Sequence, residues 1–336
     1  MRQVRPPVSV IIPTRNGSAM LRQCLDALVQ QTFRDFEIVV VDDASTDATQ
    51  DLLKSFPDVV RVTLPGEHGH GFVAAANAGL SKARGDVLAL LNNDAVPDPA
   101  WLAELTGALE RNPWASMAAS KLVLYDRPDT FHSTGDYYGL DCVPNSRGVW
   151  QRDTGQYERE EEVFGPCAAA AAYRRSMLAE LARLGGTQPP GRVLDPQLWM
   201  YCEDVDLNLR ARLRGYRTLY VPTARVRHRL SATGGGTLSS YYVGRNFIYL
   251  PAKDLPASII LRNLPHIARA QSRFALEALR HFREPAARAR LRGIIVGLLT
   301  WPRVLPARRR ILKSSRLSSR DFERLLRRFS IEARNS

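Results

Sequence analysis

Short apolar runs alternate with amphipathic stretches along the first ninety residues. Val8–Ile12 is a β-branched run ended by Pro13, and it predicts a strand buried on both faces. Residues 20–31 space their apolar side chains as one face of a helix does. The same reading predicts strands at 37–41, 59–64 and 87–91 and helices at 47–56 and 72–83. This alternation predicts right-handed βαβ crossovers and a Rossmann-like α/β sheet flanked by helices.

Ligands of such sheets bind beyond the carboxyl ends of the strands. That rule selects the loops at 13–17, 42–47 and 92–97, which are all rich in Asp, Asn and Thr. We therefore expect a polar site where these three loops meet.

The pattern changes after residue 125. Residues 125–198 are irregular and predict loops and short strands that shape the substrate site. Residues 203–213 predict a helix, and a short strand is expected to end near Val221. From residue 256 onward the chain predicts arginine-rich amphipathic helices.

Charge is distributed unevenly along the chain. Residues 1–255 carry 28 Lys and Arg against 29 Asp and Glu, whereas residues 256–336 carry 19 against 5. We predict a catalytic domain at 1–255 and a basic helical extension at 256–336 that lies on an anionic membrane surface. A helical bundle that is solvated or that forms a homo-oligomer is the alternative.

Targeting signals and metal-binding cysteine patterns are both missing from the sequence. The four cysteines lack zinc-site spacing, the first apolar run is too short for a secretory signal, and residues 294–301 are too short to cross a bilayer. These features predict a cytoplasmic enzyme that is peripheral at the inner face of the membrane.

Acidic residues follow two of the predicted strands. Asp42 and Asp43 follow the run at 37–41, and strand alternation points them to opposite sides, so that one faces a ligand while the other braces the loop. Asn93 and Asp94 follow the strand at 87–91. A carboxylate there needs solvent, hydrogen bonds or a cation, and Mg²⁺ or Mn²⁺ with phosphate oxygens fits this need. Considered alone, Asn93 and Asp94 fit a turn better than a ligand site, whereas together with Asp42 and Asp43 they favour the ligand site.

Three acids lie at the start of the helix predicted at 203–213. Glu203, Asp204 and Asp206 occupy four residues beside Trp199, and helix capping with an Asp206–Arg210 pair accounts for only part of this acidity. Asp204 and Asp206, two residues apart, are expected to have different roles.

Two weaker signals involve glycine. The GHGFVAAANAG stretch at 69–79 leads into a helix and suits a phosphate or sugar neighbour, although tight packing of helix on sheet explains it as well. His228 precedes a glycine-rich run that predicts a lid over a nucleotide, although a lone histidine is usually structural.

Together these segments resemble the inverting family 2 glycosyltransferases of the GT-A fold, in particular a rhamnosyltransferase-like bacterial branch. The resemblance is carried, in order, by VSVIIPTRNG, QTFRDFEIVVVDDASTD, GFVAAANAG, LLNNDAVPDPAWL, GPCAAAAAYRRSML and CEDVDLNLRARLRGYRTLYVP, over roughly residues 8–230. It implies transfer of a sugar from a nucleotide-diphosphate sugar, with dTDP-rhamnose as the first candidate, to a glycan or lipid-linked acceptor in cell-surface polysaccharide synthesis.

The resemblance also implies roles for single residues. Asp204 matches the general base, Asp94 takes the place of the family's DxD metal motif, in which Asn replaces the first Asp here, and His228 approaches the metal and the diphosphate. Trp199 and Glu203 are acceptor-side candidates, and Tyr137, Tyr138, Trp150 and residues 165–175 are expected to face the acceptor. The implied donor-binding residues are Pro13, Thr14, Arg15, Asp43, Asn77, Asn93 and Asp94.

Two other classes of protein remain as alternatives. A sugar-nucleotide nucleotidyltransferase uses a similar sheet and metal site, but it needs a Gly- and Lys/Arg-rich triphosphate loop, and PTRNGSA has only Arg15. A non-catalytic nucleic-acid-binding protein suits the basic tail but leaves the α/β part unexplained. We expect no nucleic-acid partner.

Overall fold

The structure is a computed structural model that describes residues 6–230 and 236–335. Its contacts divide the chain into two compact units. Unit 1 contains residues 1–135, 146–180 and 216–230, and unit 2 contains residues 136–145, 181–215 and 231–336. The units follow spatial contacts rather than chain order, so residues 181–215 group with the C-terminal helices. A domain boundary at residue 255 stays a proposal.

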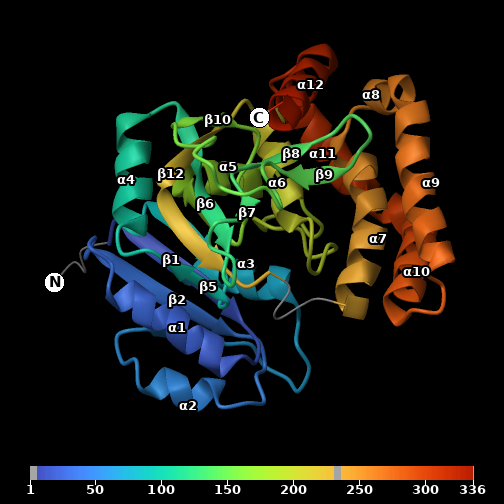
Figure 1. The fold of residues 1–336 in the computed structure, drawn as a ribbon. Helices are drawn as coiled ribbons and strands as arrows, with labels where there is room; N and C mark the ends of the chain where they lie inside the picture. Colours follow the sequence, from blue (N-terminus) through green and yellow to red (C-terminus); the bar gives the residue numbers. More distant parts are fainter. Residues whose placement is uncertain (1–5, 231–235, 336) are drawn as a thin grey trace. The chain divides into compact units, whose positions relative to one another are not determined.

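Unit 1 is built on one mixed sheet (Figure 1). Its strand order is β10-β12-β6-β11-β4-β1-β2-β3, with β5 paired to β12 and β7 paired to β6. The β1, β2, β3 and β4 strands pair in parallel, whereas β11 is antiparallel to both of its neighbours. The bounds are β1 Val8–Thr14, β2 Phe36–Asp42, β3 Val60–Thr63, β4 Val87–Leu91, β5 Ala95–Pro97, β6 Ala115–Leu124, β7 Phe131–Ser133, β10 Glu161–Val163, β11 Ala170–Arg174 and β12 Arg217–His228.

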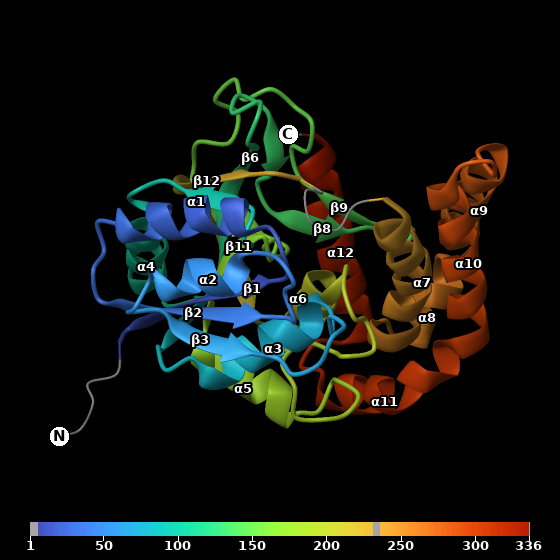
Figure 2. The same ribbon diagram turned by 90° about the horizontal axis from the view of Figure 1, so that it is seen from below.

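Helices cover both faces of this sheet. The bounds are α1 Ser18–Val29, α2 Thr49–Lys54, α3 Phe72–Lys82, α4 Trp101–Arg111 and α5 Arg175–Arg183. Apolar side chains of α1, α2 and α4 share a buried cluster with one face of β1 and β4, and Figure 2 shows α1 on that side of the strands. Ala75 of α3 packs against Val39 and Val41 on the opposite face. These layers confirm the α/β, GT-A type fold expected from the sequence.

The irregular middle segment contains more regular structure than the sequence suggests. Ala170–Arg174 is a buried strand in the centre of the sheet, and α5 follows it directly. The β12 strand continues past Val221 to His228. The poly-alanine run lacks strand propensity and alternation, so only its two neighbours in the sheet determine its conformation.

Unit 2 consists of helices and a small ribbon. The ribbon pairs β8 Asp136–Tyr138 with β9 Pro144–Ser146. The helices are α6 Glu203–Leu213, α7 Gly236–Asp254, α8 Ala257–Arg262, α9 Leu264–Arg280, α10 Pro285–Thr300, η1 Trp301–Val304, α11 Leu305–Ser314 and α12 Ser319–Asn335. Gly244, Gly293 and Gly297 let α7 and α10 touch backbone to backbone, because a Cβ at Gly244 would lie 2.6 Å from the Arg290 carbonyl oxygen.

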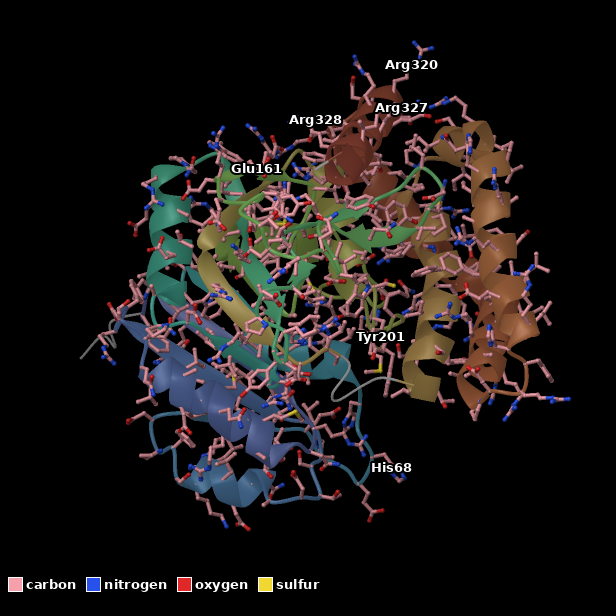
Figure 3. The ribbon with its side chains drawn as sticks, viewed as in Figure 1. His68, Glu161, Tyr201, Arg320, Arg327 and Arg328 are labelled. Carbon is pink, nitrogen blue, oxygen red and sulfur yellow. The ribbon has the colours of Figure 1, made fainter. Side chains whose placement is uncertain are left out.

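The basic C-terminal helices differ in how they use their apolar residues. On α12, Phe322, Leu326 and Phe329 are buried, while Arg320 and Arg327 project outward (Figure 3). On α10, by contrast, Ile295, Leu298 and Leu299 are 57–74% exposed. Within the described residues, none of the helices combines the length and the apolar character needed to cross a membrane.

Candidate active site

The ends of β1 and β4 meet through a pair of polar side chains. The Asn93 amide donates to the Thr14 hydroxyl over 2.8 Å, and both groups are buried. The backbone N–H of Asp43 donates to the Thr14 carbonyl oxygen over 2.8 Å, which joins the end of β2 to the same place. The structure therefore brings together the three strand-end loops that the sequence selected.

The two carboxylates after β2 have different partners. Asp43 accepts hydrogen bonds from the backbone N–H groups of His70 and Gly71, at 2.8 and 2.9 Å, and so braces the glycine-rich loop before α3. Asp42 accepts the Ser45 N–H at 3.0 Å, and its other oxygen is buried with no hydrogen-bond partner in the described chain. The sequence predicted that one of these acids faces a ligand and the other braces the loop, and Asp43, the residue implied as a donor contact, is the one that braces the loop.

Three more predicted donor-binding residues surround this loop. Arg15 is exposed, and its guanidinium passes so close to Gly69 that a Cβ there would collide with it. Pro13 is a buried residue of β1, and Asn77 is buried on α3. All of these residues belong to unit 1.

Asp94 and His228 form the most unusual pair in unit 1. Both are buried, and Asp94 Oδ1 lies 3.1 Å from His228 Nε2. This oxygen nevertheless accepts no hydrogen bond from any residue that the structure describes. The Asn92 amide nitrogen is 3.3 Å from the same Nε2. An oxygen and a nitrogen, both of kinds that bind metal ions, thus lie next to each other.

That arrangement fits a divalent cation. Neighbouring ligands of an octahedral ion with bonds of about 2.1 Å lie about 3 Å apart, which matches the Asp94–His228 separation. A buried carboxylate oxygen without a hydrogen bond is costly, and a cation would remove that cost. The sequence predicted both residues as metal ligands, and the structure places them in contact.

The sequence did not identify His132, a residue of β7 whose ring contacts that of His228. Its ring stacks on the His228 ring with centroids 4.9 Å apart and an interplanar angle of 21°. Burial, and then the neighbouring His228, lowers the pKa of His132 to about 3. An isolated histidine 96 residues away in sequence gives no signal of this contact.

The predicted base and the acceptor-side candidates belong to unit 2. Asp204 is partly exposed in the first turn of α6, and Glu203 beside it is buried. Burial, and then Asp204, raises the pKa of Glu203 to about 8, so this carboxyl group is mostly protonated at neutral pH. Trp199 stacks on Tyr242 of α7, with ring centroids 4.7 Å apart.

A strained segment leads into α6. Trp199, Tyr201 and Cys202 have φ of 62–65°, a left-handed conformation that is rare for bulky residues. Asn246 of α7 holds this segment, because its buried amide donates to the carbonyl oxygens of Leu198, Met200 and Tyr201 at 2.8–3.1 Å. Strain of this kind persists only where the surroundings enforce it, so this clamp fixes the amino end of α6.

A network of buried ion pairs also holds α6 in place. Asp206 pairs with Arg210 at 2.7 Å, as the sequence predicted, and also with Lys253 of α7. The Lys253 ammonium group lies 2.7 Å from Asp195 Oδ2. Burial alone would lower the pKa of Lys253, but Asp206 and Asp195 raise it on balance. Asp204 and Asp206 therefore have different surroundings, as expected.

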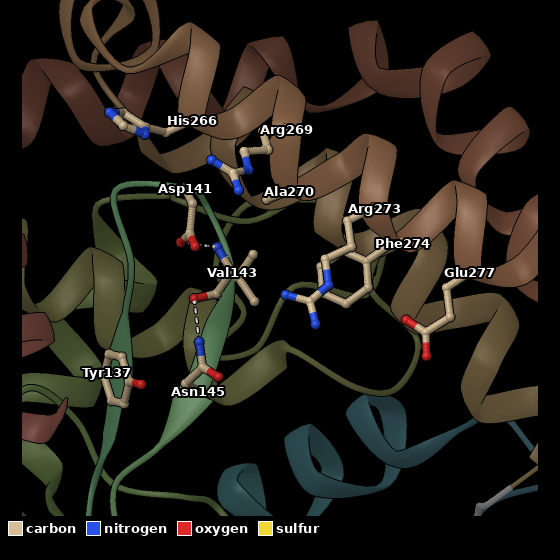
Figure 4. Close-up of a pocket in the computed structure, with 10 residues that line it drawn as sticks. All are labelled: Tyr137, Asp141, Val143, Asn145, His266, Arg269, Ala270, Arg273, Phe274 and Glu277. Atoms are coloured by element: carbon tan, nitrogen blue, oxygen red, sulfur yellow. Dashed lines mark hydrogen bonds between the residues drawn. The ribbon is translucent and has the colours of Figure 1, made fainter.

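Unit 2 also contains an open groove of about 710 Å³ between α9 and the β8–β9 ribbon (Figure 4). His266, Arg269 and Arg273 of α9 line it opposite Tyr137 and Asn145. Among the described residues, neither arginine has an ion-pair or hydrogen-bond partner. Tyr137 thus lines a groove, whereas the expected acceptor-facing Tyr138 is fully buried and does not face solvent. The lid predicted after His228 falls at 231–235, outside the described residues.

Comparison with known proteins identifies the family. Residues 9–182 match the family model of glycosyl transferase family 2. The chain belongs to this family. The O-antigen biosynthesis protein RfbC of Myxococcus xanthus is 28% identical over 237 residues, a match that covers 68% of this chain and 18% of RfbC. The chain therefore spans less than a fifth of that relative.

Two solved structures of glycosyltransferases share the fold. The crystal structure of GalNAc-T7 with UDP, GalNAc and Mn²⁺ has a TM-score of 0.54 at 18% identity, covering 71% of this chain and 47% of GalNAc-T7. The mannosyltransferase PcManGT from Pyrobaculum calidifontis, in complex with GDP-Man and Mn²⁺, has a TM-score of 0.50 at 17% identity, covering 99% of this chain and 83% of that protein. At these identities the likeness supports the GT-A fold of this family 2 chain.

Proposed function

We propose that this chain is an inverting, metal-dependent glycosyltransferase. It transfers a sugar from a nucleotide-diphosphate sugar to a glycan or lipid-linked acceptor in cell-surface polysaccharide synthesis. The observation that carries the proposal is the buried Asp94–His228 pair at the end of the sheet, with its unpaired carboxylate oxygen. Membership of family 2 favours this activity over the nucleotidyltransferase and the nucleic-acid-binding alternatives.

We assign the donor-side roles as the resemblance to family 2 implies them. Thr14, Arg15 and Asp43, with Pro13, Asn77 and Asn93 around them, bind the base and ribose of the donor. Asp94 and His228 hold Mg²⁺ or Mn²⁺. When bound, this ion neutralises the charge of the departing diphosphate.

Asp204 acts as the general base in this proposal. It takes the proton of the acceptor hydroxyl while the acceptor oxygen bonds to the anomeric carbon and the bond from that carbon to the diphosphate breaks. One displacement of this kind inverts the anomeric configuration. Trp199, Glu203 and the groove beside Tyr137 are the acceptor-side candidates.

The first experiment measures metal-dependent release of nucleoside diphosphate from a panel of nucleotide sugars, beginning with dTDP-rhamnose. We expect one donor to be turned over with Mn²⁺ or Mg²⁺ and not with EDTA. Turnover that continues in EDTA would contradict the proposal. So would transfer that retains the anomeric configuration, as seen by proton NMR of the product.

Asp94→Asn is expected to weaken Mn²⁺ binding about tenfold or more, because a neutral amide replaces the anionic oxygen that faces His228. The Kd is measured by electron paramagnetic resonance of free Mn²⁺ without donor. Asp98→Asn is the matched control, because it removes an acid four residues away and should leave the Kd unchanged. Equal affinity of the Asp94 variant and wild type would place the ion elsewhere.

We further propose that the chain attaches peripherally to the inner face of the cell membrane through α10. Ile295, Leu298 and Leu299 are exposed at helical spacing, and Arg292 and Arg288 are exposed about one and two turns before Ile295, respectively. The opposite side of α10 packs on α7, so point substitutions test this idea better than truncation does.

Leu298→Ser with Leu299→Ser is expected to reduce flotation with phosphatidylglycerol vesicles about tenfold or more, because each leucine loses about 1.5–3 kcal/mol of apolar transfer free energy. Val29→Ser with Val60→Ser, at exposed positions of unit 1, is the control and should float like wild type. If all three proteins float equally, α10 does not contact lipid. Size-exclusion chromatography then tests whether α10 contacts a second copy of the chain.

A further inference from the structure

His132 and His228 face each other with the same ring nitrogen. Their Nδ1 atoms are 3.1 Å apart and buried. A neutral imidazole has one N–H and one lone pair, so only one of these two atoms carries the shared proton. Either His228 donates from Nδ1 and leaves its Nε2 bare, or His132 donates and leaves His228 with a proton on Nε2.

Two neighbours of His228 Nε2 favour the first arrangement. The Asn92 amide nitrogen, 3.3 Å away, is a donor and therefore suits a bare Nε2. Asp94 Oδ1, 3.1 Å away, is an acceptor, but it has no hydrogen bond from the described residues. A proton on Nε2 would face the Asn92 donor and would still leave Asp94 Oδ1 without a hydrogen bond.

We infer that His132 is a positioning residue that accepts the Nδ1–H of His228 and thereby directs the bare Nε2 of His228 to the divalent cation site beside Asp94. This inference rests on the proposed function, which assigns the ion to Asp94 and His228. A hydrogen bond to the second ring nitrogen fixes both the tautomer and the orientation of a metal-binding histidine. The stacked His132 ring supplies both constraints at once.

The tautomer can be observed directly in the metal-free full chain. Nitrogen-15 NMR of the histidine side chains distinguishes a protonated ring nitrogen from a bare one. We expect His228 in wild type to show a protonated Nδ1 and a bare Nε2. The opposite pattern in wild type would overturn the inference, whatever the metal does.

Metal binding provides the second measurement. His132→Leu removes the acceptor and is expected to weaken Mn²⁺ binding about 10–100-fold, the usual cost of losing such an outer hydrogen bond. His132→Asn keeps an acceptor oxygen near the Nδ1 position and is expected to restore most of the affinity. Phe131→Leu is the control, because it disturbs the packing of β7 against Tyr157 without touching His228.

The outcomes separate two kinds of failure. If wild type binds no Mn²⁺ but shows the expected tautomer, the metal assignment in the proposed function fails and the histidine arrangement stands. If wild type binds Mn²⁺ and His132→Leu binds it equally well, His132 does not position His228. Equal weakening by Phe131→Leu and His132→Leu would reduce His132 to a packing residue.

Discussion

Asp204→Asn is expected to lower kcat by about 10²–10⁴-fold, the range that a general base usually contributes. An amide has the size of the carboxylate but does not take the proton of the acceptor hydroxyl. The donor contacts lie in unit 1, so the Kd of the nucleoside diphosphate, measured by calorimetry with Mn²⁺, should stay close to that of wild type. Stopped assays with the donor found in the panel give kcat.

Glu203→Gln is the comparison for this substitution. Glu203 is the preceding residue of α6, and burial raises its pKa, which favours the uncharged form that an amide resembles. Because Glu203 is an acceptor-side candidate, we expect its substitution to raise the acceptor KM, while kcat at pH 7 falls far less than in Asp204→Asn. If Asp204→Asn turns over normally while Glu203→Gln does not, the base has been assigned to the wrong carboxylate.

Sequence reasoning selected the candidate donor-side residues because parallel strands end at a common edge. That rule places Thr14 and Asn93 at one edge of the sheet, and the pairing of β1 with β4 then brings them within 2.8 Å of each other. Local patterns also predict the Asp206–Arg210 pair, because residues four apart on a helix are neighbours.

The residues that orient these groups have no comparable pattern in the sequence. His132 reaches His228 only because β7 pairs with β6, and β6 pairs with β12. Asn246 holds residues 198–201 from 45–48 positions away. Neither periodicity nor motif spacing encodes such pairings, because they arise when separate elements pack together. The sequence therefore indicated the candidate groups for chemistry more readily than the groups that orient them.

Lys253→Met is expected to lower the Tm by roughly 6–20 °C. Removing one partner of a buried ion pair costs about 3–5 kcal/mol, and each kcal/mol shifts the Tm of a unit of this size by about 2–4 °C. The side chains of Lys253, Asp195 and Asp206 are at most 1% exposed, so water does not replace the lost ammonium group. Differential scanning calorimetry measures the shift, and Lys313→Met, on the exposed side of α11, should leave the Tm unchanged.

A second substitution separates lost charge pairing from lost packing. Asp195→Asn added to Lys253→Met removes the carboxylate that loses its ion pair with Lys253, whereas Asp206 keeps its pair with Arg210, so the double variant should recover part of the lost Tm. No recovery would mean that Lys253 stabilises unit 2 through its aliphatic chain alone.

Asp206 follows Asp204 by two residues, and Asp195 precedes the strained turn before α6, so Lys253 joins both ends of the segment that carries the proposed base. We therefore expect Lys253→Met, assayed well below its lowered Tm, to reduce kcat as well, while Mn²⁺ binding at Asp94 and His228 in unit 1 is retained.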